Sequence, residues 1–278
     1  MSRTQSNGTS PPEPQREQRS RRPIEEPSIP WPTCNELREL AHRTASEASR
    51  VVCDTREDRS VIAAFARGIA AADCPKCDEA AIAADAERRS TEFVRTRVVT
   101  FRSETGRSLI NLEGLQTVDL LASGLRRYGL TAESAPQAAK FAALHEGRHS
   151  RDPLERGVIA ETRSEMVSDT IAALLTLSDS QRSGPAAQVA AARHALEVLA
   201  KSREDVVRHG RVTHFFGGPA IREVLSLTPE AVNALGQSGA ETYAEKTADR
   251  ILSALRPTQR RALESGSAEA LAAAMLEP

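Results

Sequence analysis

The amino-acid sequence predicts a mainly α-helical protein that carries one small β-sheet. Aromatic residues make up only 3% of the chain and hydrophobic residues 40%, so the core must be built mainly from Ala, Leu, Val and Ile. Sequence rich in alanine and leucine favours helices, and apolar residues recur at helical spacing along most of the chain. Only residues 94–112 carry β-branched and aromatic residues at the density typical of strands. We therefore expect an α+β fold.

The chain begins with a segment that is too polar to pack. Residues 1–33 are rich in Pro, Ser, Gln, Arg and Glu and have almost no apolar side chains. Such a composition cannot offset the entropy of ordering the chain, so we predict a disordered N-terminal tail. The tail is either a solubilising leader or an export or docking tag, and it lacks the apolar stretch of a Sec signal peptide. We expect a cytoplasmic protein, or one exported by a non-Sec route through this tail.

Residues 34–93 are predicted to form an N-terminal helical region. Apolar stripes at helical spacing predict helices over residues 35–52 and 58–73. A third helix is expected after Pro75, because proline is favoured in the first turn of a helix. No strand is expected in this region.

Residues 94–220 are predicted to form the central part of the protein. Two short strands, residues 94–101 and 107–112, are joined by a turn that contains Gly106. Helices are then predicted over residues 115–129, 135–150, 158–177 and 186–207, followed by an irregular stretch over residues 208–220. The remaining residues 221–278 are predicted to be a C-terminal helical region, broken by Thr-Pro and Arg-Pro pairs.

Composition and charge exclude several classes of partner. The 37 Lys and Arg residues are balanced by 38 Asp and Glu residues, which gives a net charge of −1. This balance does not favour nucleic acid or an anionic membrane surface as a partner. No apolar run approaches the roughly 20 residues that a membrane-spanning helix needs. Nothing in the sequence indicates an oligomeric state.

The four cysteines are Cys34, Cys53, Cys74 and Cys77. Four are too few for a disulfide scaffold in a chain of this size, which fits a reducing compartment. Cys74 and Cys77 form a lone CxxC pair, and no second pair completes a zinc site. We predict unpaired thiols near the start of a helix.

A motif with metal chemistry lies in the helix predicted over residues 135–150. His145, Glu146 and His149 form an HExxH sequence. Residues four apart lie about 40° apart around a helix axis, so both imidazoles project from one face and can bind a single Zn²⁺. Glu146 then lies beside a water molecule on the metal and can act as its base. A catalytic zinc also needs a third protein ligand and an open fourth position.

The following helix offers acids for that third position. Glu161, Glu165 and Asp169 are spaced four apart, so the three carboxylates share one face. Helical spacing alone leaves the choice between Glu161 and Glu165 open.

At these residues the sequence resembles the gluzincins, the zinc peptidases typified by thermolysin. In that family HExxH is followed by a helix with an Asn-Glu-x-x-Ser-Asp-like phrase, which here begins at Ser164 and ends at Asp169. The resemblance covers residues 138–170 and implies that Glu165 is the third ligand. It also implies that Asp169 orients His145 through the second imidazole nitrogen. Ser164 replaces the usual asparagine, and the gap after His149 is shorter than in thermolysin-like members.

The metzincins offer a different third ligand, six residues beyond the second histidine. That position is Glu155 here, but Asp152 occupies the place of the glycine that their turn needs. The gluzincin phrase therefore fits better.

The resemblance implies a zincin-like catalytic core over residues 94–220 and a zinc metallopeptidase whose substrate is a peptide or protein. Glu146 would be the general base. A downstream His or Tyr commonly stabilises the oxyanion in such enzymes. His214 is the first choice, with His209 and Tyr243 as alternatives, because neighbouring glycines leave room for a substrate backbone.

The strands upstream of the motif could bind the substrate in an extended form. The alternative hypothesis is a non-catalytic helical interaction protein in which HExxH is accidental or holds a structural metal. The metal content of the purified protein would distinguish the two.

Overall fold

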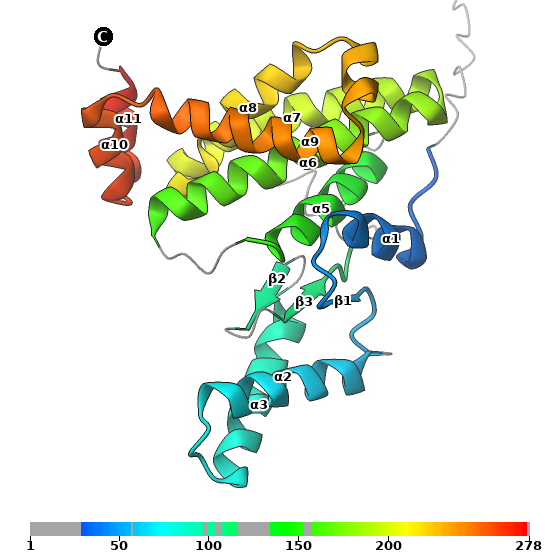
Figure 1. Ribbon diagram of the computed structural model, residues 1–278, viewed down its shortest axis with the longest axis vertical. Coiled ribbons are helices and arrows are strands. Elements are labelled where there is room, and N and C mark those ends of the chain that lie inside the picture. The colour runs from blue at the N-terminus through cyan, green and yellow to red at the C-terminus, as the bar shows by residue number, and fades with distance from the viewer. Residues whose placement is uncertain are drawn as a thin grey trace, which may run out of the picture.

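The computed structural model describes residues 29–56, 58–96, 99–103, 107–115, 134–152 and 157–276, without the side chains of residues 201–209. The fold is mainly helical with one small sheet, as predicted (Figure 1). Its elements in chain order are α1 Cys34–Thr44, β1 Ser49–Val52, α2 Arg59–Asp73, α3 Glu79–Arg95, β2 Val99–Arg102, β3 Ser108–Asn111, α5 Ala135–His149, α6 Val158–Ser183, α7 Pro185–His209, the 3₁₀ helix η1 Val212–His214, α8 Gly217–Leu225, α9 Pro229–Ser253, α10 Pro257–Glu264 and α11 Ala268–Leu276.

The sheet contains the predicted hairpin and one strand that was not predicted. The first strand of the hairpin was expected from residue 94, but α3 continues to Arg95 and β2 begins at Val99. β2 pairs antiparallel with β3, and Thr100 lies opposite Ile110. On its other side β3 pairs in parallel with β1, which gives the strand order β1-β3-β2. The prediction of a single helix over residues 35–52 is therefore wrong, because α1 ends at Thr44 and β1 follows. β1 also joins the predicted N-terminal helical region to the sheet of the central region.

Helices cover both faces of the sheet (Figure 1). On one face Leu109 packs with Ile62 of α2 and Phe93 of α3. On the other face Ile110 packs with Leu37 of α1 and Ala143 of α5. Neighbouring residues of a strand point to opposite faces, which explains why one strand contributes to two cores. β2 is the edge strand next to α5.

The largest core lies around α6, which packs against α5, α7, α8 and α9. Met166, Ile171 and Leu174 of α6 are fully buried in it. The helices predicted over residues 135–150, 158–177 and 186–207 correspond to α5, α6 and α7, and the C-terminal region is helical with breaks at Thr228-Pro229 and Arg256-Pro257.

A close contact between α1 and α5 holds the HExxH helix in place. The Thr44 hydroxyl donates a hydrogen bond to the Leu144 carbonyl at 2.7 Å. A Cβ atom at Gly147 would overlap the Ala41 carbonyl oxygen and the Thr44 hydroxyl. Only glycine at this position of the motif lets the two helices approach so closely.

All four cysteines are paired, which corrects the prediction of unpaired thiols. Cys34 forms a disulfide with Cys53, and Cys74 forms one with Cys77. The first bond ties the start of α1 to the residue after β1. The second closes the connection between α2 and α3. The spacing of Cys34 and Cys53 in the sequence did not reveal this pair. The two sulfur atoms meet only because the chain reverses direction between α1 and β1.

Two predicted segments fall mainly outside the described residues. These are the N-terminal tail, of which only residues 29–33 are described, and the helix over residues 115–129. Within the tail, Trp31 packs against the cluster that contains Leu37, and Thr33 caps α1. In the part of the chain that the structure describes, no helix combines the length and apolar character needed to cross a membrane.

Candidate metal centre

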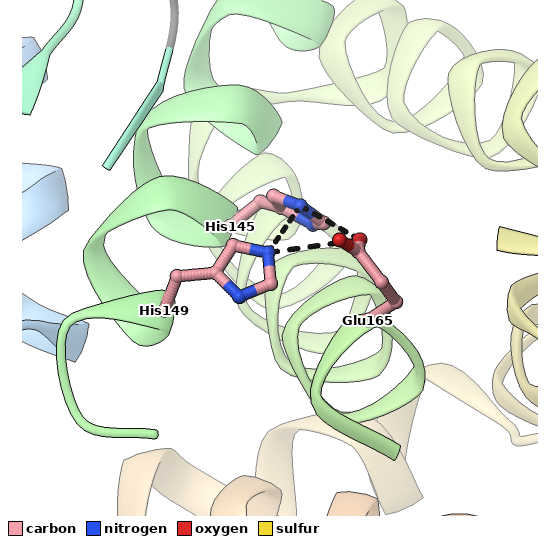
Figure 2. A group of neighbouring side chains, drawn as sticks. All are labelled: His145, His149 and Glu165. Atoms are coloured by element: carbon pink, nitrogen blue, oxygen red, sulfur yellow. Dashed lines mark hydrogen bonds and ion pairs between the residues drawn. The ribbon is translucent and has the colours of Figure 1, made fainter. Parts of the chain in front are cut away.

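α5 and α6 bring three potential metal ligands together (Figure 2). The Nε2 atoms of His145 and His149 lie 2.9 Å apart, and Glu165 Oε2 lies 3.4 Å from the first and 3.6 Å from the second. A tetrahedral zinc with bonds of about 2.0–2.1 Å needs ligand atoms roughly 3.3 Å apart. Among the described residues no other group of three His, Cys, Asp or Glu side chains is arranged in this way. The cluster can hold a metal ion.

Glu165 supplies an independent test of the fit. Its Oε2 atom is buried and has no donor in hydrogen-bonding geometry, although three imidazole nitrogens lie 3.4–3.6 Å away. A buried anionic oxygen without a donor is costly, and a cation bound between the three side chains would satisfy it. The residues present therefore fit a divalent metal.

Each histidine is oriented by a carboxylate at its other nitrogen. His145 Nδ1 lies 2.9 Å from Asp169 Oδ1, and His149 Nδ1 lies 2.9 Å from Asp152 Oδ2. The His149 contact is a hydrogen bond, and the His145 contact is an ion-pair distance. A proton on Nδ1 shared with a carboxylate leaves the Nε2 lone pair for a metal and increases the basicity of the ligand. Both rings thus present Nε2 to Glu165.

Sequence reasoning missed the partners of His149. Asp152 also accepts a hydrogen bond from Arg148, at 2.6 Å, and one from Ser164, and the Ser164 hydroxyl lies 2.9 Å from His149 Nδ1. Ser164, which departs from the usual asparagine of the family phrase, thus touches the site through this network. The available signal was the position of Asp152, three residues beyond His149 and so on the same side of the helix end.

Gly217 at the start of α8 faces Asp169. A Cβ atom there would overlap Asp169 Oδ2. We expected the glycines near His214 to leave room for a substrate backbone, but Gly217 and Gly218 are buried. Gly217 instead allows the Asp169 carboxylate to reach His145.

The carboxylates make this site strongly attractive to positive charge. Burial alone would lower the pKa of both imidazoles, but Asp169 and Glu165 raise that of His145 well above its ordinary value. Burial and the neighbouring His145 would lower the pKa of His149, yet Glu165 and Asp152 raise it to about 9. Burial would raise the pKa of Glu165, and the two histidines reverse the effect. A metal cation would experience the same attraction in place of these protons.

Glu146 lies on α5 between the two histidines and is held by the edge strand. The Thr100 hydroxyl of β2 donates to the Glu146 backbone carbonyl at 2.6 Å and to Glu146 Oε2 at 3.1 Å. Burial raises the pKa of the Glu146 carboxyl above its ordinary value, which the nearby histidines oppose. Glu146 is not one of the three clustered ligand side chains.

The other predicted residues fall at different distances from this centre. His214 Nδ1 on η1 lies 3.4 Å from Glu165 Oε2, so the structure places it at the site. Tyr243 of α9 instead packs against the core around α6. Glu161 is exposed, Glu155 lies outside the described residues, and the side chain of His209 is not described.

Comparison of the chain with family models, with curated proteins and with solved structures finds no match.

Proposed function

We propose that the protein is a zinc-dependent metallopeptidase with a zincin-like core similar to that of the gluzincins. The observation that carries the proposal is the convergence of His145, His149 and Glu165, with Glu146 beside them. Two imidazoles and one carboxylate are the donor set of thermolysin-type catalytic zinc. Calcium and magnesium prefer sites built from oxygen atoms alone, which supports zinc as the metal.

When bound, zinc would polarise the scissile carbonyl and lower the pKa of a water molecule. Glu146 would remove the proton from the attacking water and deliver it to the leaving nitrogen. The raised pKa of Glu146 supports this role, because a base is most effective when its pKa lies nearer the working pH. The Thr100 hydroxyl would hold the carboxylate in position.

His214 is proposed to stabilise the oxyanion that develops on the scissile carbonyl. It is the third imidazole within 3.4–3.6 Å of Glu165 Oε2, and its side chain is 28% exposed, more than that of His145 or His149. A donor at the solvent side of the site can reach a substrate oxygen without binding the metal itself.

The substrate is proposed to be a peptide that lies along β2. Among the described strands β1 and β2 each have a partner on one side only, and β2 is the one that contacts α5, so its other edge can pair with an extended chain near the site. Thr100 of this strand contacts Glu146, which would bring the added peptide beside the proposed base.

The test compares the parent protein with Glu146→Gln, His145→Ala and, as a control, the exposed Glu161→Gln. We expect bound zinc in the parent and in Glu146→Gln but not in His145→Ala, by elemental analysis. Cleavage of a broad peptide library should fall by orders of magnitude in Glu146→Gln and stay unchanged in Glu161→Gln. Equal cleavage by Glu146→Gln and the parent would remove Glu146 as the base. A parent without metal would favour the helical interaction protein.

An oxidising compartment outside the cytoplasm is proposed as the location. Disulfides persist in oxidising compartments, and the structure pairs all four cysteines. Alkylation of the protein in cell and medium fractions, followed by mass spectrometry, should find the disulfide form outside the cell. Free thiols in the functional fraction would contradict this location.

A further inference from the structure

A cavity on the far face of the sheet has no role in the proposed catalysis. It has a volume of about 160 Å³ and lies between the sheet and the α2–α3 hairpin. Apolar side chains, among them Ile62, Phe65, Ile69, Phe93, Phe101 and Leu109, form the larger part of its wall, and the charged side chains of Arg88, Arg89, Glu92 and Arg102 form the rest. An apolar cavity of about 150 Å³ accepts a benzene ring, so this one is large enough for one large apolar side chain.

The cavity and the metal centre share the edge strand β2. Thr100 contacts Glu146 on the α5 side of the sheet. The next residue, Phe101, points to the opposite face, where its ring packs against Phe93 with centroids 5.1 Å apart. β2 therefore has the proposed base on one face and the cavity wall on the other.

In an extended peptide that pairs with β2, successive side chains would also point to opposite faces of the sheet. Its side chains would point in turn to the α5 face and to the α2–α3 face. Exposed Arg88 and Glu92 also border the cavity, so its wall reaches the protein surface.

We propose that this cavity is a specificity subsite that accepts one large apolar side chain of the peptide substrate. The proposal rests on the proposed function and adds the substrate class, a peptide with Leu, Phe or a similar residue at one position. Ala66 and Ile69 of α2 determine how large that residue can be, because both side chains line the cavity.

The first experiment changes the size of the cavity. Ala66→Leu fills it, Ile69→Ala enlarges it, and the control Ala63→Leu places the same side chain on the exposed side of α2. Peptides that vary at one position between Ala, Leu, Phe and Trp are assayed for kcat/KM. We expect Ala66→Leu to lower the kcat/KM for the Phe peptide, relative to that for the Ala peptide, at least tenfold. Ile69→Ala should raise the kcat/KM for the Trp peptide relative to that for the Leu peptide. The Ala63→Leu profile should match the parent.

The second experiment does not depend on catalysis. N-acetyl-phenylalanine amide is titrated into protein with labelled isoleucine and leucine methyl groups, and chemical shifts are followed by NMR. We expect shifts at Ile62, Ile69 and Leu109 in the parent and in Ala63→Leu, and their loss in Ala66→Leu. If Ala66→Leu does not fold, the test uses Ile69→Ala, which should retain the Leu109 shift with an altered affinity.

The two experiments separate the subsite from the proposed function. Shifts at the cavity without any peptide cleavage would support the subsite and contradict the peptidase. Cleavage whose profile is the same in the parent, Ala66→Leu and Ile69→Ala would overturn the subsite and leave the peptidase in place.

Discussion

The Thr100 hydroxyl on β2 donates a hydrogen bond to Glu146 Oε2 at 3.1 Å, across 46 positions of sequence. This bond links the edge strand to the residue proposed as the base. It ties the edge strand of the sheet to the HExxH helix beside the candidate metal centre.

Thr100→Val should lower kcat/KM, because the methyl group keeps the shape of the side chain but cannot orient the Glu146 carboxylate. We expect a loss on the order of ten- to a hundredfold, as for other small misplacements of catalytic groups. Zinc content should not change, since Thr100 touches none of the three ligands. Thr100→Ser keeps the hydroxyl and should recover most of the rate. A serine variant as slow as the valine variant would mean that the hydrogen bond is not the cause.

Glu165→Ala should lose zinc, while Glu161→Ala should keep it. Only Glu165 reaches both imidazoles, and Glu161 is exposed on the same helix. Zinc affinity is measured by competition with a chelator of known affinity. Equal affinity in the two variants would show that the third ligand lies elsewhere.

Asp152→Asn and Asp169→Asn should each weaken zinc binding about 10- to 100-fold, the usual effect of removing the carboxylate behind a metal-bound histidine. The Asp152→Asn variant is the sharper test of the structure, because the gluzincin phrase includes Asp169 but not Asp152. Competition with the same chelator measures both variants. An unchanged affinity in Asp152→Asn would show that its contact with His149 Nδ1 does not orient the ligand.

Zinc binding at pH 7 should release at least one proton. Without metal, the neighbouring carboxylates raise the pKa of His149 to about 9 and that of His145 well above its ordinary value, so the pair holds at least one extra proton at pH 7. A metal needs the neutral imidazole, and its affinity should therefore rise as the pH increases from 7 towards 9. Calorimetry in buffers with different ionisation enthalpies counts the protons. No release at pH 7 would contradict the raised pKa values.

The same shifts set the stability of the metal-free protein. When folding raises the pKa of a histidine, its protonated form stabilises the fold at pH values below the ordinary histidine pKa. This stabilisation is lost as the pH rises through the pKa of the folded state. The melting temperature of the metal-free protein should therefore fall as the pH increases towards 9. The melting temperature of the zinc-bound protein should not fall over the same range.

Gly147→Ala should destabilise the fold by about 1–3 kcal/mol, because the added methyl group overlaps α1. Gly68→Ala in α2 is the matched control, since a Cβ atom there meets only Arg107, at 4.0 Å, and alanine is the better helix former. Denaturant unfolding should show a loss in the first variant and a small gain in the second. A Gly147→Ala protein as stable as the parent would mean that α1 and α5 can separate without cost.

The sequence by itself predicted the features that depend on local geometry. Helical spacing located α5, α6 and α7, and it placed His145 and His149 on one face because residues four apart are neighbours on any helix. β-branched residues likewise predicted the β2–β3 hairpin, whose strands are close in sequence. The family phrase then selected Glu165 from two acids that spacing could not separate, and the structure places Glu165 beside both histidines.

Only the tertiary structure decided which distant residues meet. β1 is four residues long and forms a strand because it pairs with β3, not because of its own periodicity. The contacts of Asp152 and Ser164 with His149, of Thr100 with Glu146 and of Cys34 with Cys53 depend on how whole elements pack. Packing is decided by the burial of faces from several elements at once, and no single stretch of sequence carries that information.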